Sequence, residues 1–224
     1  MTNKRGFFLT LEGAEGVGKS TNIEFITQYL EQRGIDYVLT REPGGTQLGE
    51  KIRELLIAVH EESMSELTEL LHEESMSELT ELLLVFAARA QHLDKIIEPA
   101  LAAGKWVVCD RFTDATFAYQ GAGRGLSMET IGELESMVQG ELRPDLTLIL
   151  DLDPEIGMQR ASNRGELDRF EREQMSFFRH VRQGYLDIAQ AEPERCTVID
   201  AAKSLEDVKL DLLAALEQGL SKIT

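Results

Sequence analysis

Eight residues near the start of the chain, Gly13–Ser20, read GAEGVGKS and match the phosphate-binding pattern GxxxxGK[ST]. They follow the apolar run Phe7–Leu11 and open a segment with helical periodicity. Glycines let backbone N–H groups turn toward phosphate oxygens, and the N-terminus of the following helix adds partial positive charge. The pattern restricts the chain to folds in which a strand, a phosphate-binding loop (P-loop) and a helix follow one another. It indicates an ATP or GTP site.

Two side chains of the P-loop are expected to carry chemistry. A lysine at the position of Lys19 reaches the β- and γ-phosphates, and a hydroxyl at the position of Ser20 ligates Mg²⁺. The residues predicted to contact the nucleotide are Gly13, Ala14, Glu15, Gly16, Val17, Gly18, Lys19 and Ser20.

Short apolar runs alternate along the chain with longer segments of 3.6-residue periodicity. The runs are Phe7–Leu11, Tyr37–Leu39, Trp106–Cys109, Leu146–Leu152 and Thr197–Ile199. This alternation is typical of βαβ units, and runs that are apolar at nearly every position suit strands covered on both faces. We therefore predict an α/β fold with a doubly wound, mostly parallel five-stranded sheet and helices on both faces. Ligands should bind beyond the C-terminal ends of the strands.

Length and composition limit the remaining possibilities. The 224 residues, 42% of them apolar, suffice for one core, and we predict a single domain over residues 1–224. The net charge of −17 argues against a nucleic-acid partner, because such binding neutralises many phosphates with Lys and Arg. Cys109 and Cys196 lie far apart without a neighbouring His, which argues against zinc. No apolar run approaches the ~20 residues of a membrane span, so we expect no membrane partner and a cytoplasmic protein.

A tandem duplication interrupts the middle of the chain. Residues His60–Leu71 read HEESMSELTELL, and His72–Leu83 repeat them without a change. Twelve residues leave a net rotation of about 120° along a helix, so a continuous helix could not keep one apolar face through both copies. One copy should therefore bulge outward. Two identical copies fit a recent duplication and a cloning or sequencing artefact equally well, and we expect the insert to carry no chemistry.

Segments outside the P-loop separate the possible reactions. The guanine-reading pattern N-K-x-D is absent after the P-loop, since the one Asn-Lys pair, Asn3–Lys4, precedes it. The predicted third strand is followed by Asp110 and Arg111, which puts a cation where a hydrolase carries its base. Several arginines lie at predicted strand ends and helix starts, as required to offset repulsion between two phosphoryl groups. They are Arg41, Arg53, Arg89 and Arg111.

These features favour phosphoryl transfer to a bound phosphate over hydrolysis. An ATPase or nucleotide-dependent switch without a small acceptor is the alternative from another class, and its ATP turnover would ignore every added monophosphate. A folded but inactive chain is a third reading, because the duplication lies between Arg53 and Arg89.

The sequence resembles the bacterial thymidylate kinases along almost its whole length. The motifs that carry the resemblance are the P-loop, Arg41–Thr46, Ala87–Arg89, Asp110–Phe112, Ala118–Gly121, Gly123–Gly125, Arg143–Asp145 and Arg164–Arg169. The resemblance implies a P-loop α/β core with a mobile lid at about 160–172, and a homodimer. It implies transfer of the γ-phosphoryl group of ATP to dTMP, giving dTDP for dTTP synthesis and DNA replication, with Mg²⁺ as cofactor. Another nucleoside monophosphate is the alternative acceptor.

The resemblance also implies an acceptor pocket. Arg53 and Arg111 would hold the dTMP phosphate, Arg89 the thymine ring, and Tyr119 the sugar, where it excludes a 2′-hydroxyl. The remaining expected pocket residues are Glu42, Pro43, Phe86, Thr116 and Gln120. Of these, Thr116 and Gln120 would contact the base. Family members often carry an aromatic residue at the position of Val85, so either Val85 or Phe86 packs on the base.

The catalytic residues implied by the resemblance come from the P-loop, the third strand and the lid. They are Glu15, Lys19, Asp110, Arg111 and Arg164. Glu15 would face the sugar 3′-hydroxyl or the metal shell, and Asp110 would act near the phosphates through water. Because the P-loop contains no arginine, a lid arginine should reach the γ-phosphate; Arg164 is the first candidate, with Arg160 and Arg169 as alternatives.

Overall fold

The computed structural model describes residues 5–57, 76–162, 169–171 and 173–221. Its centre is a five-stranded sheet, and every strand pair is parallel. The strands are β1 (Phe8–Glu12), β2 (Tyr37–Arg41), β3 (Trp106–Asp110), β4 (Leu146–Asp151) and β5 (Cys196–Asp200). Each of the five apolar runs in the sequence forms one of them. The predicted doubly wound parallel sheet is confirmed.

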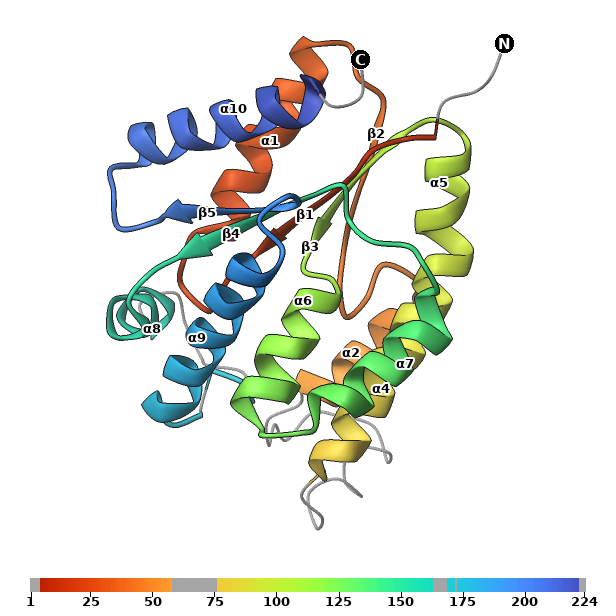
Figure 1. The fold of residues 1–224 in the computed structure, drawn as a ribbon, viewed down its shortest axis with the longest axis vertical. Helices are drawn as coiled ribbons and strands as arrows, with labels where there is room; N and C mark the ends of the chain where they lie inside the picture. The colour runs from red at the N-terminus through yellow and green to blue at the C-terminus, as the bar shows by residue number, and fades with distance from the viewer. Residues whose placement is uncertain (1–4, 58–75, 163–168, 172, 222–224) are drawn as a thin grey trace.

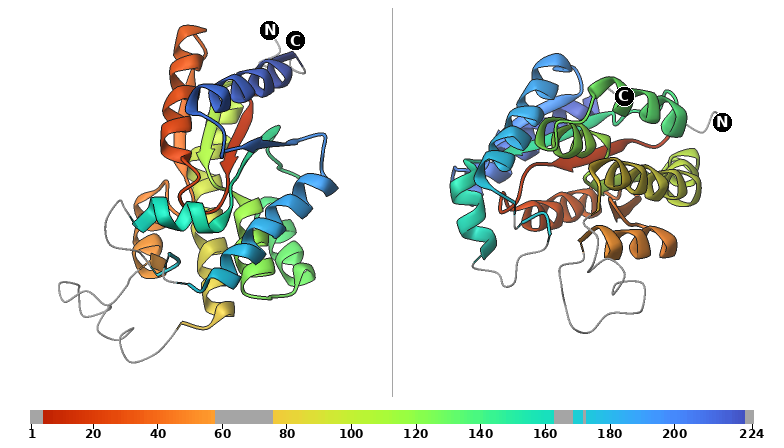
Figure 2. Two further views of the ribbon diagram at one scale, coloured as in Figure 1. Left: turned by 90° about the vertical axis from the view of Figure 1, so that its left-hand side faces the viewer. Right: turned by 90° about the horizontal axis from the view of Figure 1, so that it is seen from below.

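Helices cover both faces of the sheet (Figure 1). They are α1 (Lys19–Gln32), α2 (Gln47–Ile57), α4 (Glu78–His92), α5 (Glu98–Ala102), α6 (Thr113–Thr116), α7 (Met128–Gln139), α8 (Pro154–Ser162), α9 (Met175–Ala191) and α10 (Leu205–Ser221), with π-helical segments at Leu93–Ile97 and Phe117–Gly123. Helices α1 and α10 lie together on one face, where α1 contacts β1 and β3 and α10 contacts β4 and β5 (Figure 2). On the other face, α5 contacts β3, and α9 contacts β4 and β5.

Alternating strand residues explain the two layers of core. In β1, Leu9 and Leu11 belong to a cluster that includes α1 and α10, whereas Phe8 packs with Val107 and Cys109 against α5. Successive strand side chains point to opposite faces, so a strand that is apolar throughout requires cover on both. The core thus fixes the sheet and, with it, the loops at its C-terminal edge.

The strand order is β2-β3-β1-β4-β5, which places β1 in the middle of the sheet. The connections on its two sides run in opposite directions along the sheet, first toward β2 and later toward β5. Ligands of such sheets bind outside the strand ends where the direction of winding changes. The loop after β1, which is the P-loop, lies at that point.

The described part of the duplicated segment belongs to the second copy. Ser77 caps α4 by accepting a hydrogen bond from the Thr80 backbone N–H at 3.2 Å. Leu82 is fully buried against Phe86, and Glu81 is 1% exposed. The end of the second copy is therefore an integral part of α4. The predicted outward bulge falls on residues outside the described ranges.

The chain has no membrane-spanning candidate in its described part, because none of the helices there combines sufficient length with sufficient apolarity to cross a bilayer.

Candidate active site

The P-loop has the backbone that the sequence pattern requires. Gly13, Gly16 and Gly18 have φ values of 135°, 70° and 90°, a region that residues with a Cβ rarely adopt. Helix α1 begins directly afterwards, so its free N–H groups face the loop. The Lys19 ammonium donates to the carbonyl oxygens of Gly13 and Ala14, at 3.2 Å each. Its contacts hold it across the loop, where a phosphate would bind.

The P-loop also touches the backbone of α8. A Cβ on Gly16 would lie 1.9 Å from the Gly157 carbonyl oxygen, and one on Gly157 would lie 2.4 Å from the Glu15 carbonyl oxygen. Both distances are shorter than any real contact. Only glycine at both positions allows α8, which leads toward the predicted lid, to pack against the nucleotide loop.

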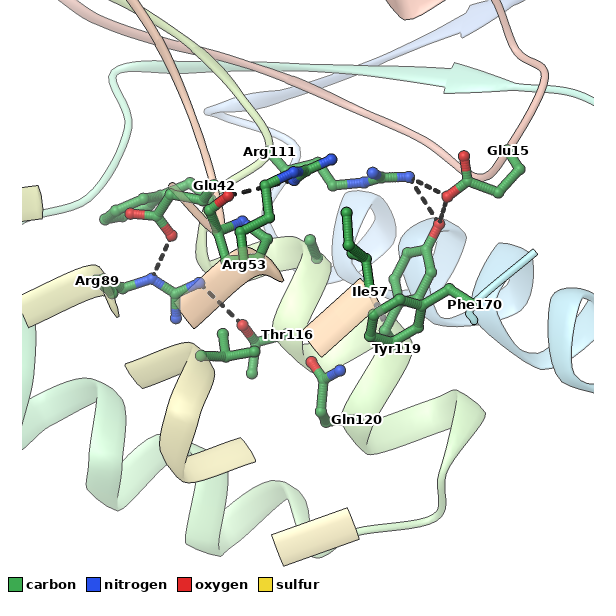
Figure 3. Close-up of a pocket in the computed structure, with 14 residues that line it drawn as sticks. Glu15, Glu42, Arg53, Ile57, Arg89, Arg111, Thr116, Tyr119, Gln120 and Phe170 are labelled. Carbon is green, nitrogen blue, oxygen red and sulfur yellow. Dashed lines mark hydrogen bonds and ion pairs between the residues drawn. The ribbon is translucent and has the colours of Figure 1, made fainter. Parts of the chain in front are cut away.

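A pocket of about 560 Å³ adjoins the P-loop (Figure 3). Its lining residues are Glu15, Glu42, Pro43, Arg53, Ile57, Val85, Arg89, Arg111, Phe112, Ala115, Thr116, Tyr119, Gln120 and Phe170. All but one of the residues expected to bind dTMP are among them. Residues from the P-loop, α2, α4, α6 and the segment after β2 thus meet in one cavity.

The exception is Phe86. It is 2% exposed and packs with Leu82 and Ile131, while its ring lies 4.9 Å from the Arg89 guanidinium carbon. Of the two neighbours considered from the sequence, Val85 lines the pocket. Phe86 instead packs against the guanidinium group of Arg89 and does not line the pocket.

Glu15, Arg111 and Tyr119 form a closed triangle at the P-loop end of the cavity. Arg111 Nη2 donates to Glu15 Oε1 at 2.5 Å and contacts the Tyr119 hydroxyl at 2.9 Å, and that hydroxyl donates to Glu15 Oε1 at 2.9 Å. Arg111 is a non-glycine residue with φ of 68°, a strained conformation of the kind held at functional sites. Burial by itself raises the pKa of Glu15, but the charges of Arg111 and Lys19 outweigh it and lower the pKa to about 2. The Glu15 carboxylate is therefore ionised at neutral pH.

Arg89 and Glu42 organise the opposite end of the cavity. Arg89 Nε donates to Glu42 Oε2 at 2.7 Å, and Arg89 Nη2 donates to Thr116 Oγ1 at 2.9 Å. The other Glu42 oxygen lies 2.9 Å from His92 Nδ1. Arg89 and Glu42 are 1% and 4% exposed. Figure 3 shows this pair well apart from Glu15, with the cavity between them.

Arg53 extends from α2 into the same cavity and donates to the Pro43 carbonyl oxygen at 3.2 Å. A second pocket lies beside it at the ends of β2 and β3, and Ser20, Arg41 and Asp110 line it. Arg41 pairs there with Glu50 at 2.6 Å. The arginines grouped by sequence therefore divide between two adjoining pockets.

The predicted lid is described only in part. Arg164 lies outside the described residues. Arg160 donates to the Ala201 carbonyl oxygen at 3.5 Å, and Arg169 donates to the Leu56 carbonyl oxygen at 2.8 Å and pairs with Glu81 at 2.5 Å. Arg169 thus joins the lid segment to α2 and α4.

Four wall residues were not expected in the pocket from the sequence, and one of them, Phe112, directly follows Arg111. Ile57 ends α2, Ala115 lies in α6, and Phe170 comes from the predicted lid, with its ring centroid 6.0 Å from that of Tyr119. The charge-rich lid pattern contains Phe170 as its one aromatic residue, which was the available signal.

A P-loop whose glutamate also lines an arginine-rich cavity defines a P-loop kinase that acts on a small phosphorylated acceptor. The family model described as "Thymidylate kinase" matches residues 11–212. The chain belongs to the thymidylate kinase family.

Individual relatives agree with this assignment. The chain is 58% identical over 211 residues to a thymidylate kinase from Pseudomonas putida (strain GB-1), covering 94% of this chain and 95% of the relative. It is 54% identical to the thymidylate kinase of Teredinibacter turnerae, covering 96% and 99%. Among solved structures, thymidylate kinase from Ehrlichia chaffeensis superimposes with a TM-score of 0.72 at 35% identity, covering 95% of this chain and 99% of that one.

Proposed function

We propose that MgATP bound at Gly13–Ser20 donates its γ-phosphoryl group to dTMP held in the adjoining cavity, giving dTDP for dTTP synthesis. The phosphorylation of dTMP to dTDP follows from family membership at 54–58% identity. One observation carries the assignment of the two sites: Glu15 belongs to the P-loop and also lines the cavity. A donor on one side of Glu15 and an acceptor on the other would have adjacent phosphates.

We assign the P-loop end of the cavity to the acceptor phosphate. Arg53 and Arg111 both line this region, and two guanidinium groups can offset the repulsion between donor and acceptor phosphates. Lys19 would neutralise charge on the donor phosphates. Catalysis would then consist of in-line positioning and charge stabilisation without a covalent intermediate.

The residues present fit Mg²⁺. Ser20 and Asp110 line the same pocket, and Asp110 Oδ1 is buried and has no hydrogen-bond partner within the described part of the chain. Hydroxyl and carboxylate oxygens suit Mg²⁺, which usually keeps several waters and binds through few protein ligands. Mg²⁺ bound there would neutralise charge on the phosphate oxygens; the hydroxyl of Ser20 would be a direct ligand and Asp110 an indirect one.

We assign the sugar to Tyr119 and Glu15, and the base to Arg89, Thr116 and Gln120. Tyr119 is locked by its hydrogen bonds to Glu15 and Arg111, so it cannot move aside for a 2′-hydroxyl. Arg89 is equally fixed by Glu42 and Thr116. Glu42, Pro43 and Val85 would form the surrounding wall.

Product analysis tests this proposal. Purified chain is incubated with MgATP and each of dTMP, dUMP, UMP, CMP and AMP, and the diphosphate formed is quantified by anion-exchange chromatography. We expect dTDP as the dominant product. In Lys19→Met, which removes the ammonium group of the P-loop, the rate of dTDP formation should fall at least a hundredfold. Equal formation of several diphosphates would contradict the acceptor assignment.

We further propose a cytoplasmic homodimer, on the strength of the family resemblance. Light scattering after size-exclusion chromatography tests the dimer, because a dimer of this 25.1 kDa chain has a mass of about twice that value. A mass equal to one chain would contradict it.

A further inference from the structure

Glu81 is a buried carboxylate beside the cavity that the assignments above leave without a role. It lies in α4, within the second copy of the repeated segment, and is 1% exposed. Gln120 Nε2 donates to Glu81 Oε1 at 2.8 Å, and Arg169 Nη2 donates to Oε2 at 2.5 Å. Arg124 adds longer hydrogen bonds of 3.3 and 3.4 Å. Glu81 thus binds Gln120, which lines the cavity, and also binds Arg124 and Arg169, which do not.

The charge of Glu81 dictates the orientation of the Gln120 amide. Burial by itself raises the pKa of Glu81, but the Gln120 hydrogen bond and the Arg169 charge outweigh it and lower the pKa. An ionised carboxylate can only accept hydrogen bonds. The amide must therefore turn its NH₂ group toward Glu81, which leaves its carbonyl oxygen for the cavity that Gln120 lines.

Arg89 supplies the complementary group in the same cavity. Its Nε and Nη2 are occupied by Glu42 and Thr116. Its Nη1 is buried and has no hydrogen-bond partner among the described residues. Arg89 thus has one N–H group without a partner beside the cavity, and Gln120 turns a fixed acceptor toward a base that enters it (Figure 3).

Thymine and cytosine differ in the hydrogen-bonding groups that they would present to Arg89 and Gln120. Thymine presents the O4 acceptor beside the N3–H donor, whereas cytosine presents the N4–H₂ donor beside the N3 acceptor. We propose that Glu81 is a positioning residue for base selection, which fixes the Gln120 amide so that the cavity pairs with thymine and rejects cytosine. The inference rests on the proposed function, because it requires the acceptor base to lie between Arg89 and Gln120.

The experiment compares kcat/KM for dTMP and dCMP in the unaltered chain and in Glu81→Gln. A neutral amide at this position can donate as well as accept, so the Gln120 amide is free to rotate and offer its NH₂ group to N3 of cytosine. The ratio of kcat/KM for dTMP over dCMP should fall at least tenfold, while KM for ATP stays within threefold. Arg124→Gln is the matched control, since it removes another partner of Glu81 and leaves the Gln120 hydrogen bond; its ratio should stay within twofold.

Three results would overturn the inference. The first is an unchanged ratio of kcat/KM in Glu81→Gln. The second is an equal fall of that ratio in Arg124→Gln, which would indicate a general loosening of the cavity wall. The third is an unaltered chain that does not prefer dTMP over dCMP. If Glu81→Gln does not fold, Glu81→Met frees the same amide without adding a polar group and is subject to the same criteria. Absence of any dTMP turnover by the unaltered chain would instead contradict the proposed function.

Discussion

Replacing Arg89 with Met separates the structural and binding roles of the buried ion pair. The substitution leaves the Glu42 carboxylate, 4% exposed, without the guanidinium at 2.7 Å. Breaking a buried pair in this way costs about 3–5 kcal/mol, because an uncompensated charge remains in the interior. For a chain of 224 residues this corresponds to a fall in melting temperature of about 6–20 °C. The same change removes a charged donor from the cavity, which should weaken dTMP binding by about 10- to 150-fold.

The double variant Arg89→Met/Glu42→Gln tests the reasoning. Neutralising Glu42 removes the buried charge, so most of the lost stability should return, whereas the affinity for dTMP should stay low. Calorimetric melting gives the stability, and titration calorimetry with dTMP gives the affinity. If the single variant melts within 2 °C of the unaltered chain, or if the double variant is no more stable than the single one, the electrostatic account of this pair is wrong.

Three further predictions follow from other contacts. Gly157→Ala places a Cβ 2.4 Å from the Glu15 carbonyl oxygen, so it should displace the P-loop and raise KM for ATP at least tenfold; unchanged ATP kinetics would contradict the packing of α8 on this loop. Burial and the charge of Asp114 raise the pKa of Glu12 from 4.5 to about 8, so the folded state binds the extra proton and stability should fall as pH rises from 4.5 to 8, by about 5 kcal/mol in total. Glu12→Gln should remove this slope in denaturation measured across that range, and an undiminished slope would refute the assignment. Deletion of residues 72–83 restores a single copy, which supplies the same sequence to α4, so the folded state and dTMP turnover should persist with a change in stability of about 1 kcal/mol or less; loss of the cooperative melting transition would contradict this.

The sheet was predictable because its signal is local. The run Phe7–Leu11 is apolar at four of its five positions, and it leads directly into a glycine pattern typical of a nucleotide-binding loop. Because β1 is buried on both faces, helices must cover both sides of the sheet. The parallel arrangement and the position of the loop then follow from chain connectivity.

The packing of α4 was not predictable in the same way. Val85 and Phe86 are adjacent apolar residues about 100° apart around the helix, and both faces are buried, one with α2 and the other with α7. Which of these faces borders the cavity depends on how α2 and α7 dock, which periodicity does not specify. Glu81 could not be identified from the sequence for the same reason. A glutamate within a repeated acidic segment is expected to be exposed to solvent, and its donors Gln120, Arg124 and Arg169 come from other parts of the chain.

The most direct test of the central claim is a coupled ADP-release assay with MgATP and each monophosphate in turn, on the chain as it stands and on the chain lacking residues 72–83. We expect rapid turnover that depends on dTMP in both chains, and much slower turnover with dUMP, UMP, CMP and AMP. Turnover in the shortened chain alone would mean that the duplication disables the acceptor site. ADP release that ignores dTMP in both chains would contradict the assignment of this cavity as an acceptor site for phosphoryl transfer.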